Sequence, residues 1–338
     1  MIIKFINSDK KYFKVINNCM KIAIFFLKIL LDAFRDTLKV CKYFNLVKLN
    51  NSFVVVKIFI IRFFYSFESI RNRIKSTNPV NEVEKQFIID DNYKVKNIIE
   101  DLNELGHSKI FNIGSELNNQ IKEGAFLAKD FDLKKLKNGM DQHEIIKSTG
   151  ETDSEYFNRL RNRGISRIST VINLNNKSPL SNFILSDEIL AVAKNYLNTN
   201  KISINATLLI STPLEISEKD KYENAQYYHW DNDFTKFLKL YLYLNDVNED
   251  GGPHIFVPGT HKKKEFSTKL CRLYSDKNIA QKYSKNKKFV GKKGSMFFVD
   301  SYGLHKGEHP TGKSRLMLNV HFGRGKIIYF KNDLYIKT

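Results

Sequence analysis

From residue 202 onward, the chain consists of short β-branched and aromatic runs separated by turn-forming residues such as Gly251-Gly252-Pro253 and Pro258-Gly259. Several short strands with regular breaks are typical of an all-β sandwich or barrel. We therefore predict a mainly β protein with flanking α-helices, whose core is a double-stranded β-helix (a jelly roll, as in cupins). The expected strands are 202–212, 225–231, 237–245, 254–257, 295–299 and 315–322.

Before these strands, the sequence favours helices. We expect them at 81–105, 140–149 and 187–197, the last beginning at Ser186 or Asp187 and carrying an apolar stripe. The turn-forming residues at 76–79, which end in a proline, mark a boundary. We expect a basic amphipathic N-terminal segment over 1–79 and a β-helix domain with its leading helices over 80–338.

His229 and Asp231 are two residues apart within the expected strand 225–231. Successive side chains of a strand point to opposite faces, so this imidazole and this carboxylate project together and Trp230 points away. A third ligand from a distant segment would complete two histidines and one carboxylate, a set that suits non-haem Fe(II) oxygenases because it leaves coordination positions open. We favour His305 over His309, because the strand 295–299 leads towards His305.

Arg315 begins the last expected strand, and alternation puts it on one face with Met317, Asn319 and His321. A lone charge inside a barrel is costly unless an anion meets it. Guanidinium holds carboxylate through paired charge-assisted hydrogen bonds. A dicarboxylate co-substrate would therefore be a suitable partner for Arg315.

The sequence around these residues resembles the phytanoyl-CoA dioxygenase family of Fe(II)- and 2-oxoglutarate-dependent oxygenases. The resemblance covers 202–323 well and 120–200 loosely, and residues 1–80 lie outside it. The ordered combination is more specific than the His-X-Asp pair alone. It comprises the stretches 228–233, 242–247 and 250–261, followed by His305 and Arg315.

The resemblance implies a role for each matching residue. His229, Asp231 and His305 would bind Fe(II), and Arg315 would hold the far carboxylate of 2-oxoglutarate. The family also uses a side chain from an early strand on the co-substrate, for which the candidates are Asn205, Thr207 and Tyr241.

The implied reaction is the oxidation, most simply the hydroxylation, of a C–H bond in a small organic substrate. O₂ and 2-oxoglutarate would be consumed, and succinate and CO₂ released. The sequence does not identify the prime substrate or the type of oxidation. The alternative is a non-catalytic jelly-roll binding protein, attached to a membrane or partner through its basic N-terminal helix.

The formal net charge of +19 favours an anionic partner. No binding motif interleaves aromatic residues with cations, so nucleic acid is a weak candidate. The segment 262–290, expected with 213–225 to flank the cavity as a loop, is rich in lysine. An anionic substrate is one hypothesis for it, and a solvated loop is the other.

The first 80 residues carry fifteen Lys and Arg against four acidic residues, a net charge of 15 − 4 = +11. Read as a helix, residues 14–42 have a narrow basic stripe and a broad apolar face. That face either packs on protein or lies on an anionic membrane surface. The three cysteines form no disulfide framework, and no apolar run is long enough to span a bilayer. We expect a cytoplasmic protein with possible peripheral membrane contact.

Overall fold

The computed structural model describes residues 95–126, 147–148, 150–174, 178–223, 226–231, 236–265, 273–324 and 334–337. The segment 14–42 and nearly all of the predicted helix 140–149 lie outside these ranges. None of the helices within them combines the length and the apolarity needed to cross a bilayer.

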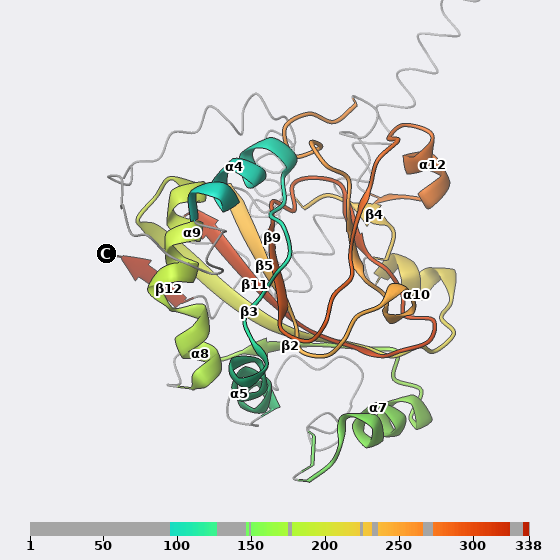
Figure 1. Ribbon diagram of the computed structural model, residues 1–338. Helices are drawn as coiled ribbons and strands as arrows, with labels where there is room; N and C mark the ends of the chain where they lie inside the picture. Colours follow the sequence, from blue (N-terminus) through green and yellow to red (C-terminus); the bar gives the residue numbers. More distant parts are fainter. Residues whose placement is uncertain are drawn as a thin grey trace, which may run out of the picture.

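Two antiparallel sheets form the core of the fold (Figure 1). The larger one has the strand order β1-β9-β5-β11-β3-β12, and β2 also pairs with β3. Its strands are β1 (Phe111–Asn112), β2 (Arg167–Ile172), β3 (Lys201–Ser211), β5 (Phe237–Tyr243), β9 (Ser295–Val299), β11 (Arg315–Arg324) and β12 (Leu334–Lys337).

The smaller sheet has the order β7-β4-β10-β6-β8. The two sheets confirm the predicted jelly roll, in which strands from distant parts of the sequence become neighbours. The strands of the smaller sheet are β4 (Tyr228–His229), β6 (His254–Phe256), β7 (Leu273–Tyr274), β8 (Lys287–Phe289) and β10 (His305–Gly307).

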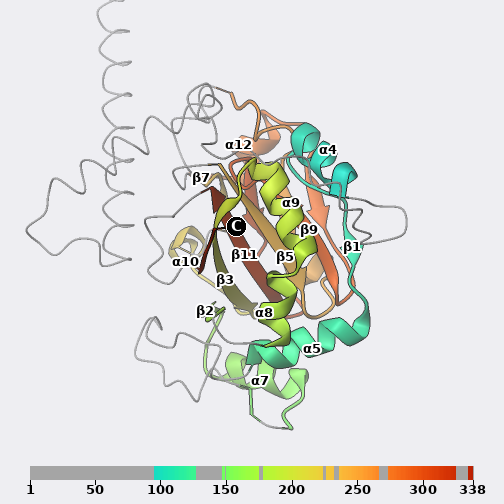
Figure 2. The ribbon, with the colours of Figure 1, turned by 90° about the vertical axis from the view of Figure 1, so that its left-hand side faces the viewer.

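Helices cover one face of the larger sheet, and α9 lies across it in Figure 2. Their apolar side chains join those of alternate strand residues, such as Leu208 and Leu318, in one buried cluster. The described helices are α4 (Val95–Leu105), α5 (Ser115–Phe126), α7 (Asp153–Asn162), α8 (Pro179–Ile184), α9 (Asp187–Leu197), α10 (Glu218–Glu223) and α12 (Asp276–Ala280), with a 3₁₀ turn at Glu249–Gly251.

The opposite face of the larger sheet looks into the jelly roll, towards the smaller sheet. The alternation predicted for β11 is confirmed, since Leu316, Leu318 and Val320 pack in the cluster beneath the helices, whereas Met317 packs with Tyr241 and Phe297 in a separate one. The polar residues of β11 therefore point into the interior, where a ligand would bind.

The local signals for the helix 187–197 are also confirmed. Ser186 caps α9 by accepting a hydrogen bond from the amide of Ile189, and Asn198 ends the helix in the left-handed conformation, with φ of 50°. Of the predicted helix 81–105, the structure describes the part from Val95 onward, and α4 ends at Leu105 as expected.

Two predictions about the smaller sheet were wrong in detail. The expected strand 225–231 is only Tyr228–His229 in the structure, because the amide of Asp231 donates to the carbonyl of Ser301 outside the ladder. The segments 213–225 and 262–290 are not plain loops. The first contains α10, and the second contains β7, β8 and α12, which the Ser275 side chain caps.

Candidate metal centre

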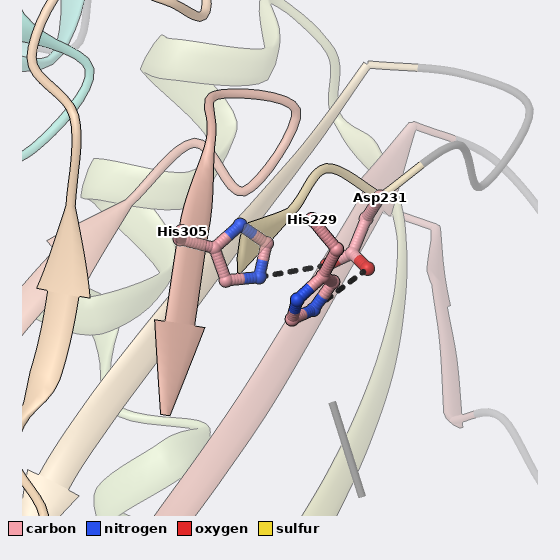
Figure 3. A group of neighbouring side chains, drawn as sticks. All are labelled: His229, Asp231 and His305. Atoms are coloured by element: carbon pink, nitrogen blue, oxygen red, sulfur yellow. Dashed lines mark ion pairs between the residues drawn. The ribbon is translucent and has the colours of Figure 1, made fainter. Parts of the chain in front are cut away.

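Three side chains that the sequence singled out converge inside the jelly roll (Figure 3). His229 ends β4, Asp231 follows it, and His305 begins β10. Each offers one ligand atom, and these atoms lie within 4.8 Å of one another. His229 Nε2 is 3.9 Å from Asp231 Oδ1, and His305 Nε2 is 3.5 Å from Asp231 Oδ2. The arrangement brings two imidazoles and one carboxylate close enough to share a single cation.

Backbone carbonyls orient both imidazole rings. His229 Nδ1 lies 2.9 Å from the carbonyl of Tyr227, and His305 Nδ1 lies 2.9 Å from that of Gly303. A carbonyl only accepts, so each Nδ1 carries the proton and donates. Each Nε2 then has its lone pair turned towards Asp231. This tautomer is the one that a metal-binding histidine needs, and the donor set fits a divalent transition metal.

A lysine that sequence reasoning missed contacts the carboxylate of this trio. Lys239, on β5, places its Nζ 2.6 Å from Asp231 Oδ2, and the two side chains are 13% and 9% exposed. The available signal was alternation, since Lys239 is two residues before Tyr241, which was already expected to face the interior. An ammonium group therefore lies beside the predicted metal ligands.

Arg315 is buried at the start of β11, with its guanidinium inside the fold. One terminal nitrogen donates to the carbonyl of Gly252, and the other lies 3.4 Å from Ser211 Oγ. The Nε–H has no hydrogen-bond partner among the described residues. Burial lowers the pKa of Arg315. A buried guanidinium with remaining donor capacity fits an anionic ligand.

His254 lies next to the trio. It begins the expected strand 254–257, and the structure buries it in β6, with its ring centroid 5.4 Å from that of His305 and 4.5 Å from that of Tyr241. Burial, and after it the positive charge near His305 and Arg315, holds the pKa of His254 well below its usual value. A neutral imidazole thus packs against the predicted metal ligand His305.

The three candidates for the additional co-substrate contact all belong to inward-facing positions. Thr207 Oγ1 accepts a hydrogen bond from the side chain of Asn319 at 3.2 Å, and Asn205 is buried opposite His321 in the β3–β11 pairing. Burial raises the pKa of Tyr241, which keeps its hydroxyl protonated.

Other histidines lie outside the cluster. His309 contacts the carbonyl of Leu214 through Nε2 and the amide of Gln226 through Nδ1. His261 lies 3.2 Å from the carbonyl of Asn103. The described part of the chain therefore brings His305, and not its rival His309, to His229 and Asp231.

Several solved structures resemble the chain. HygX from Streptomyces hygroscopicus, with nickel and 2-oxoglutarate bound, is 11% identical at a TM-score of 0.45, over 67% of this chain and 85% of that one. The epimerase SnoN, in complex with Fe³⁺, α-ketoglutarate and nogalamycin RO, is 14% identical at 0.43, over 68% and 83%. AviO1 from Streptomyces viridochromogenes Tue57 is 14% identical at 0.42, over 67% and 93%.

A family model matches part of the chain. No curated protein matches the chain. The family model described as phytanoyl-CoA dioxygenase (PhyH) matches residues 174–317, which include all three converging side chains and Arg315. Over residues 174–317 the chain is therefore similar to the phytanoyl-CoA dioxygenase family.

Proposed function

We propose that this protein is a dioxygenase that hydroxylates a C–H bond of a small organic substrate and releases succinate and CO₂. The observation that carries the proposal is the convergence of His229, Asp231 and His305 within 4.8 Å, with both imidazoles oriented by backbone carbonyls. Fe(II) with 2-oxoglutarate and O₂ would supply the oxidising chemistry at this site.

In this proposal one group of residues binds the metal and another residue binds the co-substrate. His229, Asp231 and His305 bind the ion through three positions and leave the others for exchangeable ligands. Arg315 neutralises the distal carboxylate of 2-oxoglutarate through its guanidinium. These groups are buried, and aromatic residues such as Tyr241 and Phe297 form a buried cluster in the same interior, which keeps bulk water away from the reacting atoms.

For the substrate itself, we propose an anionic compound. The described lysines of 262–290 give this idea little support, because Lys264 lies over the ring of Tyr302 and Lys288 pairs with Glu249. Better support comes from Arg167 on β2. Ser211 on β3 lies opposite Arg167 in the β2–β3 pairing and opposite Arg315 in the β3–β11 pairing. Residues opposite each other share a face. Arg167 therefore faces the interior, partly exposed, where it can meet an anion.

The proposals for the N-terminal segment rest on its sequence. We propose that the protein acts in the cytoplasm and that residues 14–42 contact an anionic membrane surface through their basic stripe. Co-sedimentation of the full chain and of a chain lacking residues 1–75 with phosphatidylserine vesicles tests the contact. Equal partitioning of the two proteins would rule it out.

Anaerobic titration of the purified protein with Fe(II) and then 2-oxoglutarate tests the proposed activity. A dioxygenase should develop a weak visible charge-transfer band, and it should release succinate once air is admitted. A screen of phosphorylated and carboxylated compounds for stimulated succinate release then addresses the substrate. A protein that develops no band and releases no succinate would not be a dioxygenase of this type.

A further inference from the structure

We propose that Lys239 is a positioning residue that holds Asp231 as a one-oxygen ligand of the metal. This inference deepens the proposed function and depends on it, since it concerns how the same site is kept in shape. The three predicted ligands all come from the smaller sheet or from the segment that follows β4. Lys239 comes from β5, so a strand of the larger sheet would also help to shape the metal centre.

The two oxygens of Asp231 have different surroundings. Oδ1 faces His229 Nε2 at 3.9 Å. Oδ2 lies 2.6 Å from Lys239 Nζ and 3.5 Å from His305 Nε2. A contact of 2.6 Å between ammonium and carboxylate is a short charge-assisted hydrogen bond, the strong kind in a buried setting. One oxygen of the carboxylate is thus engaged by the protein itself.

This engagement matters for the number of positions left open on the metal. A carboxylate can bind a cation through one oxygen or both, and the second mode takes an additional position. Two imidazoles and a one-oxygen carboxylate fill three of six octahedral positions. A chelating co-substrate and O₂ need the other three. If the ammonium of Lys239 binds one oxygen of Asp231, that oxygen cannot occupy a further coordination position on the metal, and the position stays available.

The backbone and the lysine hold Asp231 from two directions. Its amide donates to the carbonyl of Ser301 at 2.9 Å, which fixes the main chain next to β4. Lys239 reaches the carboxylate from the opposite sheet, between the buried rings of Phe237 and Tyr241 on the same face of β5. Because those neighbours are aromatic, the ammonium needs an anion there, and Asp231 supplies it.

The test compares metal affinity among lysine variants, measured by anaerobic calorimetry with Ni(II), which does not depend on turnover. Outer contacts of this kind typically change metal affinity by about 10- to 100-fold. We expect Lys239→Met to weaken Ni(II) binding by a factor in that range and Lys239→Arg to restore most of it. With Co(II), the visible spectrum of Lys239→Met should change as its carboxylate takes up a second position.

Lys306→Met is the matched control. Lys306 is also a buried lysine, and it directly follows the predicted ligand His305 in the sequence. Its Nζ, however, pairs with Asp276, 2.8 Å away. Its Ni(II) affinity should stay near that of the unmodified protein. If Lys239→Met does not fold, the comparison of Lys239→Arg with Lys239→Gln decides, because both are polar and only Arg retains the charge.

Unchanged or tighter Ni(II) binding in Lys239→Met would overturn the inference, because it would mean that the ammonium is dispensable or competes with the metal. Equal affinities of the Arg and Gln variants would do the same. Failure of the unmodified protein to bind Ni(II) at all would instead count against the proposed function, so the two failures are distinguishable.

Discussion

His305 lies directly opposite His229 where β10 pairs with β4, and their ring centroids are 4.2 Å apart. The two residues are far apart in the sequence, yet the antiparallel pairing makes them immediate neighbours. Each ring is then oriented by the carbonyl two residues before it. The register of two short strands thus creates the pair of imidazoles that a metal centre requires.

The first prediction follows from this pairing. His305→Ala should abolish succinate release and reduce Ni(II) affinity by at least about 100-fold, because it removes one of three ligands. His309→Ala, four residues away, should retain both properties, since His309 contacts Leu214 and Gln226 instead. Coupled succinate assays and calorimetry on the two variants measure the difference. Loss of metal affinity in His309→Ala alone would reverse the assignment.

The second prediction concerns Arg315. Hydrogen bonds to charged groups contribute roughly 1.5–3 kcal/mol, so Arg315→Met should raise the KM for 2-oxoglutarate by about 10- to 100-fold. The kcat at saturating 2-oxoglutarate should change much less. Steady-state kinetics with varied 2-oxoglutarate measure both.

A matched control lies on the same strand. Arg324, at the end of β11, donates to the carbonyl of Leu197 rather than towards the interior. Arg324→Met should leave the KM for 2-oxoglutarate unchanged. Equal KM values in Arg315→Met and in the unmodified protein would refute the proposed anchor.

Much of this centre follows from alternation along single strands. The spacing of His229 and Asp231 predicted that they share a face, and they do lie together, although the strand ends at His229. The alternation of β11 predicted that Arg315 points inward, and its burial among interior groups agrees. Local patterns of this kind can be predicted from the sequence because successive side chains of a strand alternate between its two faces.

Lys239 and His254 were missed for the opposite reason. The pattern of β5 predicts that Lys239 faces inward, but its contact with Asp231 depends on how the two sheets pack against each other. His254 directly follows the Gly251-Gly252-Pro253 turn, and only the pairing of β6 with β10 brings it next to His305. Contacts between sheets depend on the whole fold, and a single sequence does not specify them.

The third prediction is a dependence of stability on pH. Burial, followed by the charge of Lys239, lowers the pKa of His321 from 6.5 to about 3. The unfolded chain binds a proton at His321 below pH 6.5, and the folded protein does not. Stability should therefore fall as the pH drops from 6.5 towards 3, and it should not change through His321 above that window.

Denaturant titrations at pH 7.5 and pH 5.5 measure this effect. His321 should account for a loss of roughly 1 kcal/mol in the free energy of unfolding between the two values. His321→Gln removes the titrating group, so this variant should lose correspondingly less stability over the same interval. Identical losses in the two proteins would mean that His321 is protonated in the folded state.

The fourth prediction separates the stability of the fold from the metal centre. Leu318 is fully buried on the helix-facing side of β11, opposite Leu208 on β3 and Leu242 on β5. Leu318→Ala should reduce the free energy of unfolding by about 2–5 kcal/mol, through lost apolar contact and the cavity it leaves. Leu117→Ala should change it by less than about 0.5 kcal/mol, because that side chain is 38% exposed.

Because Leu318 and the predicted metal ligands lie on opposite sides of the larger sheet, the destabilised variant should still bind Ni(II) with nearly unchanged affinity under conditions where it is folded. Urea titration provides the first quantity and calorimetry the second. A large loss of metal affinity in folded Leu318→Ala would mean that the packing beneath the helices sets the geometry of the centre. The strand register alone would then be insufficient to form it.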